Sequence, residues 1–265
     1  MPVRTGLESL IRATRAKPGA VVFLAVPDDA IHRTATGIAR AAGRIPTATA
    51  FVHLSGASGL DALEPLAKAH SIGSFHPLQS FPSVRPPAAF EGITIALDSR
   101  SPRLMRRLAR LARDLGARPK AVGEKERAAY HAAAVFASNY VNALMGEAVA
   151  LLESVGWSER EAVNGLIPLA TGALDNIKRK GPVGALTGPI RRGDVATVER
   201  HLQALSALGA SAPSRTGPPA EAVYRMLGSI ALEIAKTAGL EPAAAGRMQR
   251  ALTRKVAATR RRGGR

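Results

Sequence analysis

Three short segments place polar or conformationally unusual residues directly after apolar runs. They are Val26–Ile31 (VPDDAI), His53–Gly56 (HLSG) and Ser74–Phe81 (SFHPLQSF). In open α/β sheets, ligands bind outside the carboxyl ends of the strands. Each segment alone is also typical of a turn or a helix cap. Together they predict a ligand-binding cleft along one edge of a sheet.

A second set of polar residues falls on one predicted helix rich in Ala and Val. At 100° per residue, Ser138 and Asn142 each lie within about 20° of His131, and Asn139 lies about 80° away. A polar stripe on such a helix needs a partner. An ordinary histidine titrates near pH 6.5, which suits a general acid. We therefore predict His131 as a catalytic residue with Ser138 and Asn142 beside it; the alternative is an interface histidine.

A third candidate is the segment 187–194, TGPIRRGD. Gly and Pro fix the loop, and Asp194 is placed to cap the helix that follows. Arg191 or Arg192 can hold a substrate carboxylate through two parallel hydrogen bonds. The alternative is an exposed loop with two solvated arginines.

The elements that must position these residues change character along the chain. The first part alternates short β-branched runs with helical patterns, and Leu104, Leu108, Leu111 and Leu115 form one apolar stripe after an N-cap at Ser101. This alternation predicts a doubly wound, parallel α/β domain. The predicted strands cover residues 20–26, 49–54, 71–75 and 92–97.

No convincing strand follows residue 119, so the second part is predicted to be all helical. Ser158 and Glu161 form a capping box that opens one helix. The Gly- and Pro-rich segment 181–193 is predicted to be a loop. The predicted helices cover 123–154 without a break, 158 onward, 194–208, 218–238 and 242–258. We expect an α/β domain over 1–118, a helical domain over 119–258, and a basic disordered tail over 259–265.

Composition narrows the functional classes. The 265 residues include no cysteine, which excludes a disulfide framework and a thiol nucleophile, and no metal site is expected. No run of 18 apolar residues and no signal-peptide core is present, so we expect a cytoplasmic protein without a membrane partner. The net charge of +17 raises a nucleic-acid partner as a hypothesis. Aromatic residues are only 4% and no binding motif appears, so we expect a small-molecule substrate instead.

Five motifs give the chain a family resemblance. It resembles Rossmann-like oxidoreductases that carry a C-terminal helical domain of unknown function, similar in plan to pyrroline-5-carboxylate reductase, ketopantoate reductase and 6-phosphogluconate dehydrogenase. The resemblance implies an NAD- or NADP-binding domain and a helical domain that also mediates homodimerisation. The motifs are LAVPDDAI (24–31), HLSGASGLDAL (53–63), GSFHPLQSF (73–81), YHAAAVFASNYVNAL (130–144) and TGPIRRGD (187–194).

One departure from that family concerns the cofactor. Its members begin with a strand and a GxGxxG turn that binds the pyrophosphate, and the chain has no such turn. We expect that the first βαβ unit is absent from this chain. Two readings follow: an NAD(P)-dependent oxidoreductase acting on a small carbonyl or imine, or a non-catalytic small-molecule or regulatory binding protein. The predicted cofactor contacts are Val26, Pro27, Asp28, His53, Ser55 and Gly56, and the predicted substrate contacts are His76, Pro77, Gln79, Asn139, Arg191 and Arg192.

Overall fold

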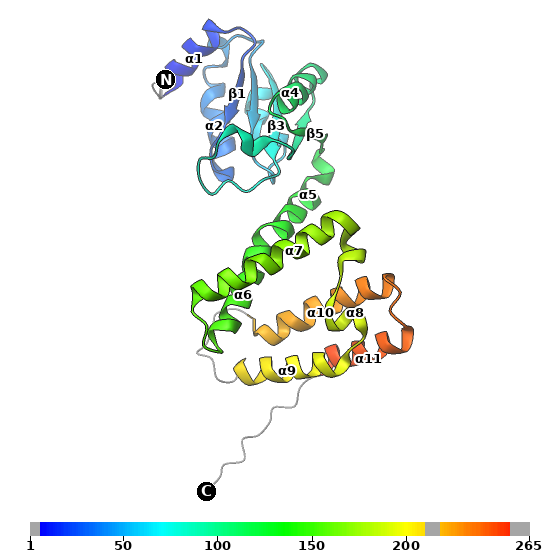
Figure 1. The fold of residues 1–265 in the computed structure, drawn as a ribbon. Helices are drawn as coiled ribbons and strands as arrows, with labels where there is room; N and C mark the ends of the chain where they lie inside the picture. Colours follow the sequence, from blue (N-terminus) through cyan, green and yellow to red (C-terminus); the bar gives the residue numbers. More distant parts are fainter. Residues whose placement is uncertain (1–5, 210–217, 255–265) are drawn as a thin grey trace. The chain divides into compact units, whose positions relative to one another are not determined.

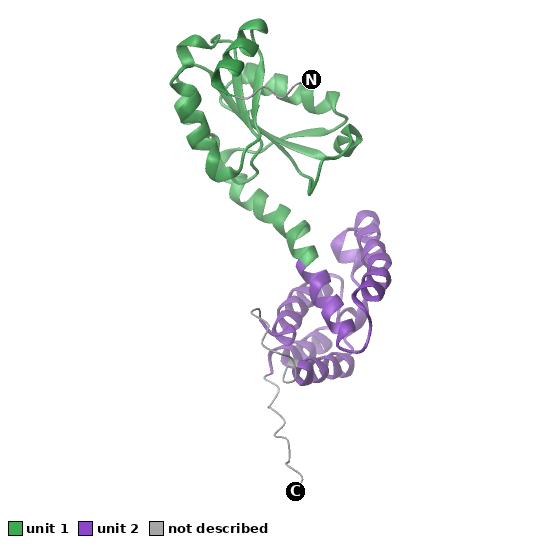
Figure 2. Cartoon of the chain, turned by 90° about the vertical axis from the view of Figure 1, so that its left-hand side faces the viewer, with its two compact units in different colours: residues 1–142 green, residues 143–265 purple. Residues whose placement is uncertain are grey.

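A computed structural model describes residues 6–209 and 218–254 (Figure 1). Within it the chain divides into two compact units, Met1–Asn142 and Ala143–Arg265 (Figure 2). The first unit extends past the expected boundary at residue 118, because the segment that follows remains bonded to the sheet through Arg127. The expected basic tail, 259–265, lies outside the described residues.

A five-stranded sheet forms the centre of the first unit, in the order β1-β2-β3-β4-β5. β3 and β4 are antiparallel and the other pairs are parallel. The predicted α/β fold is confirmed, and all four predicted strands are present. A fifth strand, β5, was not predicted. The strands are β1 (Val21–Leu24), β2 (Ala50–His53), β3 (Ser71–Pro77), β4 (Thr94–Ser99) and β5 (Arg118–Ala121).

Helices cover both faces of this sheet (Figure 1). On one face, Ile11 of α1, Ile31 of α2 and Leu63 pack with Phe51 of β2. On the other face, the predicted leucine stripe of α4 packs against β2 and β4, and Ser101 caps α4 as expected. The sheet is therefore doubly wound. The helices that flank the sheet are α1 (Leu7–Ala16), α2 (Asp28–Ala39), α3 (Glu64–Ala67) and α4 (Pro102–Asp114), with short 3-10 turns at Ala42–Arg44, Leu60–Leu63 and Pro87–Phe90.

The predicted unbroken helix over 123–154 is wrong. α5 (Glu124–Ala137) ends at Ser138, whose φ of −126° and ψ of −70° are not helical, and α6 (Asn139–Glu153) begins at the next residue. Within the described ranges, the segment Glu124–Glu153 is the one stretch that is long and apolar enough, by length and composition alone, to cross a membrane.

The second unit is all helical, as predicted. Its core is formed by Val198, Leu202, Leu232, Met248 and Leu252. The capping box of Ser158 and Glu161 is present. The loop predicted over 181–193 is helical at both ends, with a kink at Gly181. The helices are α7 (Glu159–Ala185), α8 (Gly188–Arg192), α9 (Val195–Gly209), α10 (Ala220–Thr237) and α11 (Pro242–Thr253).

Candidate functional site at the strand ends of the first unit

The ends of β1 and β2 are joined by side-chain hydrogen bonds. The Ser55 hydroxyl donates to the Asp28 carboxylate at 2.7 Å. The same oxygen accepts the backbone N–H groups of Ala57 at 3.1 Å and Ser58 at 2.9 Å. β1, β2 and β3 run parallel, so their carboxyl ends share one edge. The structure therefore brings the first two predicted segments together, and Asp28 fixes the loop that carries Gly56.

Gly56 allows two histidines to approach that loop closely. A Cβ built on Gly56 would lie 2.7 Å from Nε2 of His76 and 2.8 Å from Nδ1 of His131. Both distances are far below van der Waals contact, so a side chain at residue 56 and the observed imidazole positions are incompatible. Gly56 thus provides the space that both imidazoles occupy, and its predicted contact with a cofactor stays a prediction.

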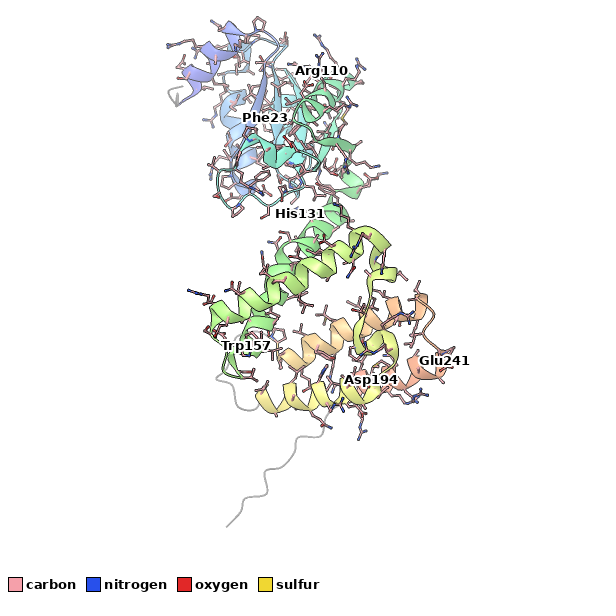
Figure 3. All side chains as sticks on the ribbon, in the orientation of Figure 1. Phe23, Arg110, His131, Trp157, Asp194 and Glu241 are labelled. Atoms are coloured by element: carbon pink, nitrogen blue, oxygen red, sulfur yellow. The ribbon has the colours of Figure 1, made fainter. Side chains whose placement is uncertain are left out.

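The two histidines belong to a cluster with Tyr130. Nδ1 of His76 and the Tyr130 hydroxyl are 2.8 Å apart, and the ring centroids of His76 and His131 are 6.3 Å apart. His76 is the second-last residue of β3, whereas Tyr130 and His131 come from α5. Figure 3 labels His131 on this helix. Tyr130 was not among the predicted site residues; its place beside His131 in the YHAAAV motif was the one available signal.

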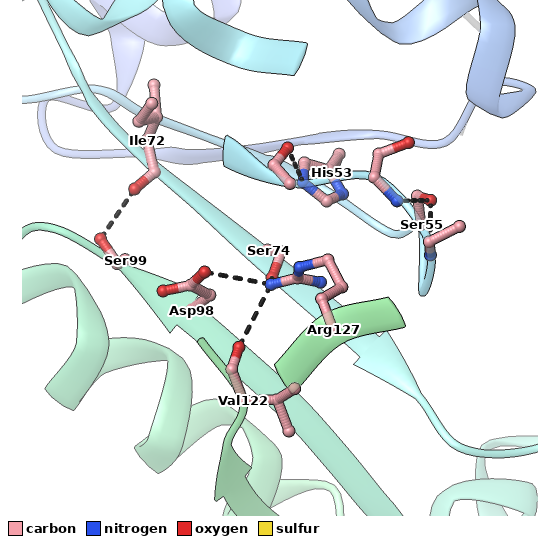
Figure 4. A network of polar contacts seen from close by, with 11 residues as sticks. His53, Ser55, Ile72, Ser74, Asp98, Ser99, Val122 and Arg127 are labelled. Atoms are coloured by element: carbon pink, nitrogen blue, oxygen red, sulfur yellow. Dashed lines mark hydrogen bonds and ion pairs between the residues drawn. The ribbon is translucent and has the colours of Figure 1, made fainter. Parts of the chain in front are cut away.

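A buried arginine of α5 connects this helix to β3 and β4 (Figure 4). Arg127 is 2% exposed, and its Nη2 donates to Ser74 Oγ at 2.9 Å, Asp98 at 3.1 Å and the Val122 carbonyl at 3.3 Å. Sequence analysis missed Arg127, because a single arginine in a predicted helix does not reveal that it pairs with a residue 29 positions away.

Burial, assisted by the charge of Arg127, keeps the imidazoles of His53 and His76 neutral. Burial lowers the pKa of His53 to about 4, and the Arg127 charge adds to the effect. Burial, then the charges of His131 and Arg127, lower the pKa of His76, while Asp28 opposes them. Burial raises the pKa of Tyr130. At neutral pH, His76 therefore serves as a hydrogen-bonding group and Tyr130 keeps its proton.

A cavity of about 660 Å³ opens beside the cluster. Polar groups line it together with small apolar side chains of α5, a composition typical of small-molecule sites. Five of the predicted catalytic and substrate residues lie on its wall. These are His76, Gln79, His131, Ser138 and Asn139.

Other predicted residues lie elsewhere. The His53 side chain is fully buried, and its Nε2 lies 3.2 Å from the Gly59 carbonyl, so it cannot contact a cofactor. The helix break at Ser138 disrupts the expected stripe, and Asn142 is absent from the cavity wall. Pro77 is half-buried and is likewise not among the lining residues. Val26 packs against the core, while Pro27 is exposed.

Arg191 and Arg192 line a different hollow, within the second unit. It has a volume of about 590 Å³ and includes Gly239 and Glu241. Arg191 donates to the Ala238 carbonyl at 2.9 Å. Asp194 and Glu241 bond backbone N–H groups at the starts of α9 and α11 (Figure 3). Arg191, Asp194 and Glu241 therefore satisfy backbone groups at helix ends.

A model of one protein family, a domain of unknown function named DUF2520, matches residues 93–231. The chain belongs to the DUF2520 family. The matched region includes α5 with Tyr130 and His131, so the family segment carries two of the three residues of the cluster described above. No curated protein matches this DUF2520 chain.

Solved structures share the fold of this DUF2520 protein. Protein TM1727 from Thermotoga maritima is 25% identical with a TM-score of 0.66, covering 82% of this chain and 79% of its own. The "putative NADP oxidoreductase" BF3122 from Bacteroides fragilis is 22% identical with a TM-score of 0.64, covering 80% and 75%. Plasmodium falciparum pyrroline carboxylate reductase, solved with NADP bound, is 12% identical with a TM-score of 0.52, covering 94% and 82%. The predicted resemblance to Rossmann-like oxidoreductases with a helical second part is confirmed at the level of the fold.

Proposed function

We propose that this DUF2520 protein is an NAD(P)-dependent oxidoreductase that acts on a small carbonyl or imine substrate. The observation that carries the proposal is the cluster of His76, Tyr130 and His131 on the wall of one cavity, at the edge of a sheet shared with NADP oxidoreductases. A protonatable group beside a substrate cavity is what reduction of a C=O or C=N bond requires of the protein.

His131 is the proposed proton donor. It lines the cavity, and its Nδ1 is buried against Gly56, which leaves Nε2 as the nitrogen available to a substrate. The hydrogen bond with Tyr130 fixes the His76 ring, and the His76 ring packs edge-on against the His131 ring at a centroid distance of 6.3 Å. Gln79 and Asn139 supply further hydrogen-bonding groups on the wall.

A nicotinamide cofactor would supply the hydride, and the first turn of α2 fits the pyrophosphate of such a cofactor poorly. In Rossmann folds the pyrophosphate lies at a helix N-terminus after a glycine-rich turn. α2, which follows β1, instead carries Asp28 and Asp29 in its first turn, and these carboxylates repel a pyrophosphate. The described residues therefore account for substrate binding and proton transfer, with no place for the pyrophosphate on α2.

Nucleotide titration tests the proposal. NADPH or NADH at 100 times its dissociation constant stabilises a folded protein by about 2.7 kcal/mol, which a thermal melt detects. We expect stabilisation of the wild type and of His131→Gln, because His131 acts on the substrate. The cofactor assignment would be contradicted if AMP or inorganic phosphate stabilised the protein as much as NADPH or NADH does. It would also be contradicted if neither NADPH nor NADH stabilised the protein.

The second candidate is a non-catalytic small-molecule or regulatory binding protein. The acidic first turn of α2 favours it, because it weakens the case for a dinucleotide. This reading predicts that a small polar ligand binds beside His76 and His131 and is recovered unchanged. Ligand binding with no turnover in the presence of either nucleotide would select it over the oxidoreductase.

We further propose that the chain forms a homodimer through the helical unit. The large apolar residues Val163, Ile167, Leu174 and Ile177 follow one face of α7, and all are exposed. Ala162 is the one buried residue of α7 in the described chain. An uncovered apolar stripe of this length is typical of an interface. Light scattering should report a dimer for the wild type and a monomer for Ile167→Glu; monomeric wild type would contradict the proposal.

A further inference from the structure

Arg127 is the one side chain of α5 that connects the helix to three parts of the sheet layer. Its Nη2 bonds Ser74 of β3, Asp98 of β4 and the carbonyl of Val122, just after β5. The Arg127 side chain is 3% exposed and that of Asp98 is 16% exposed. Removing a cation from water is costly, so the buried position of Arg127 depends on these three hydrogen bonds and on the ion pair with Asp98.

The residues that follow Arg127 explain what its position controls. Tyr130 and His131 stand three and four residues farther along the helix, so they share the face of α5 that Arg127 occupies. His76 stands two residues after Ser74 on β3, so the side chains of both residues project from the same face of the strand. α5 and β3 are thus joined by two neighbouring hydrogen bonds, Arg127 to Ser74 and Tyr130 to His76, and the first of these is the more deeply buried.

We infer that Arg127 is a positioning residue, which locks the turn of α5 that carries Tyr130 and His131 onto the strand that carries His76. The inference rests on the proposed function for the reaction that His131 serves. The lock itself is a property of the apo protein and can be measured without cofactor or substrate.

The charge of Arg127 also affects the titration of the neighbouring histidines His76 and His53. The charged and titratable groups around His76 are Tyr130, His131 and Arg127 on α5 and Asp28 on α2. Nε and Nη1 of Arg127 are buried and make no hydrogen bond within the described chain. Beside the larger effect of burial, the positive charge of Arg127 lowers the pKa of both His76 and His53.

Histidine ring NMR tests this inference with three variants. Arg127→Gln removes the charge, Arg127→Lys keeps it without the three-way hydrogen bonding, and Leu108→Ala is a core variant that destabilises the same unit without altering charge. The readouts are the His76 tautomer, the contact between His76 and Tyr130, and the pH titration of the histidine rings.

We expect Arg127→Gln to raise the pKa of His76 and His53 and to remove the single His76 tautomer that the Tyr130 hydrogen bond selects. Arg127→Lys should keep the wild-type titration but loosen the contact, and Leu108→Ala should change neither. If Arg127→Gln does not fold, the Arg127→Lys result decides alone. An unchanged contact in Arg127→Gln or Arg127→Lys, or the same changes in Leu108→Ala, would overturn the inference. Failure to bind a nucleotide would leave these results intact.

Discussion

The two units of this protein both contain arginines beside a hollow, and they use them differently. In the first unit, Arg127 is buried and holds the wall that presents Tyr130 and His131. In the second unit, Arg191 bonds a helix-end carbonyl and Arg192 is exposed. The comparison teaches that residue type and a nearby cavity do not define a site. Interlocked polar side chains from several elements, as in the first unit, are the stronger sign of chemistry.

Replacing each arginine tests the contrast between the two units with the largest expected effect. Arg127→Met leaves Asp98 partly buried without its partner, and we expect it to lower the free energy of unfolding by about 3–5 kcal/mol. Arg191→Met removes one hydrogen bond to a carbonyl, and we expect a loss of about 1 kcal/mol. Denaturant unfolding measures both. Equal losses would contradict the contrast between the two units.

The pH dependence of stability sharpens the description of the first unit. The pKa of His53 is about 4 in the folded protein, against 6.5 when unfolded. Below pH 6.5 the unfolded state binds more protons, so stability is complete above that value and falls as the pH drops toward 4. The expected loss from His53 is about 3 kcal/mol.

His53→Gln should flatten this slope, and His32→Gln, at an exposed position on α2, should leave it unchanged. Unfolding curves collected across this pH range give the comparison. Burial also lowers the pKa of His70 and His76, so a shallower slope should remain in His53→Gln. A slope as steep as that of the wild type would show that His53 is not its main cause.

Two glycines of the first unit should respond to alanine with opposite signs. Gly56→Ala places a methyl group against His76 and His131, and we expect a loss of about 1–3 kcal/mol together with displaced imidazoles. Gly37→Ala, in α2 with nothing within 4 Å, should gain about 0.5–1 kcal/mol. Thermal melts compare the two; a neutral Gly56→Ala would mean that the histidines do not hold their observed positions.

The smallest expected effect is at Tyr130. Tyr130→Phe removes its hydrogen bond to His76, and we expect a stability loss of about 1 kcal/mol. The ring NMR spectrum of His76 should change, whereas that of His201, which pairs with Tyr224 in the second unit, should not. A spectrum of His76 identical to the wild type would remove Tyr130 from the cluster.

Sequence patterns predicted the parts of this fold that repeat locally. β-branched runs indicated the buried strands, and the leucine stripe with Ser101 indicated α4. β5 was missed because Arg118–Ala121 is a short edge strand with polar residues and a proline, which edges tolerate. The break at Ser138 was missed because serine carries no strong helix-breaking signal.

Some residues of the candidate site were predicted from the sequence, and others were not. His76 and His131 were predicted from strand-end position and residue type, and both line the cavity. Arg127 and Tyr130 were missed because their roles depend on contacts with residues more than 50 positions away in the chain. His53 was misassigned because sequence cannot distinguish a histidine at the rim of a sheet from one buried beneath it.

Consumption of NADPH or NADH with a panel of small aldehydes, 2-oxo acids and cyclic imines tests the central claim most directly. We predict turnover with at least one compound, a loss of about 10²- to 10⁴-fold in His131→Gln, and near wild-type rates in Arg191→Gln. Turnover that survives in His131→Gln but is lost in Arg191→Gln would place the chemistry in the second unit and contradict the account.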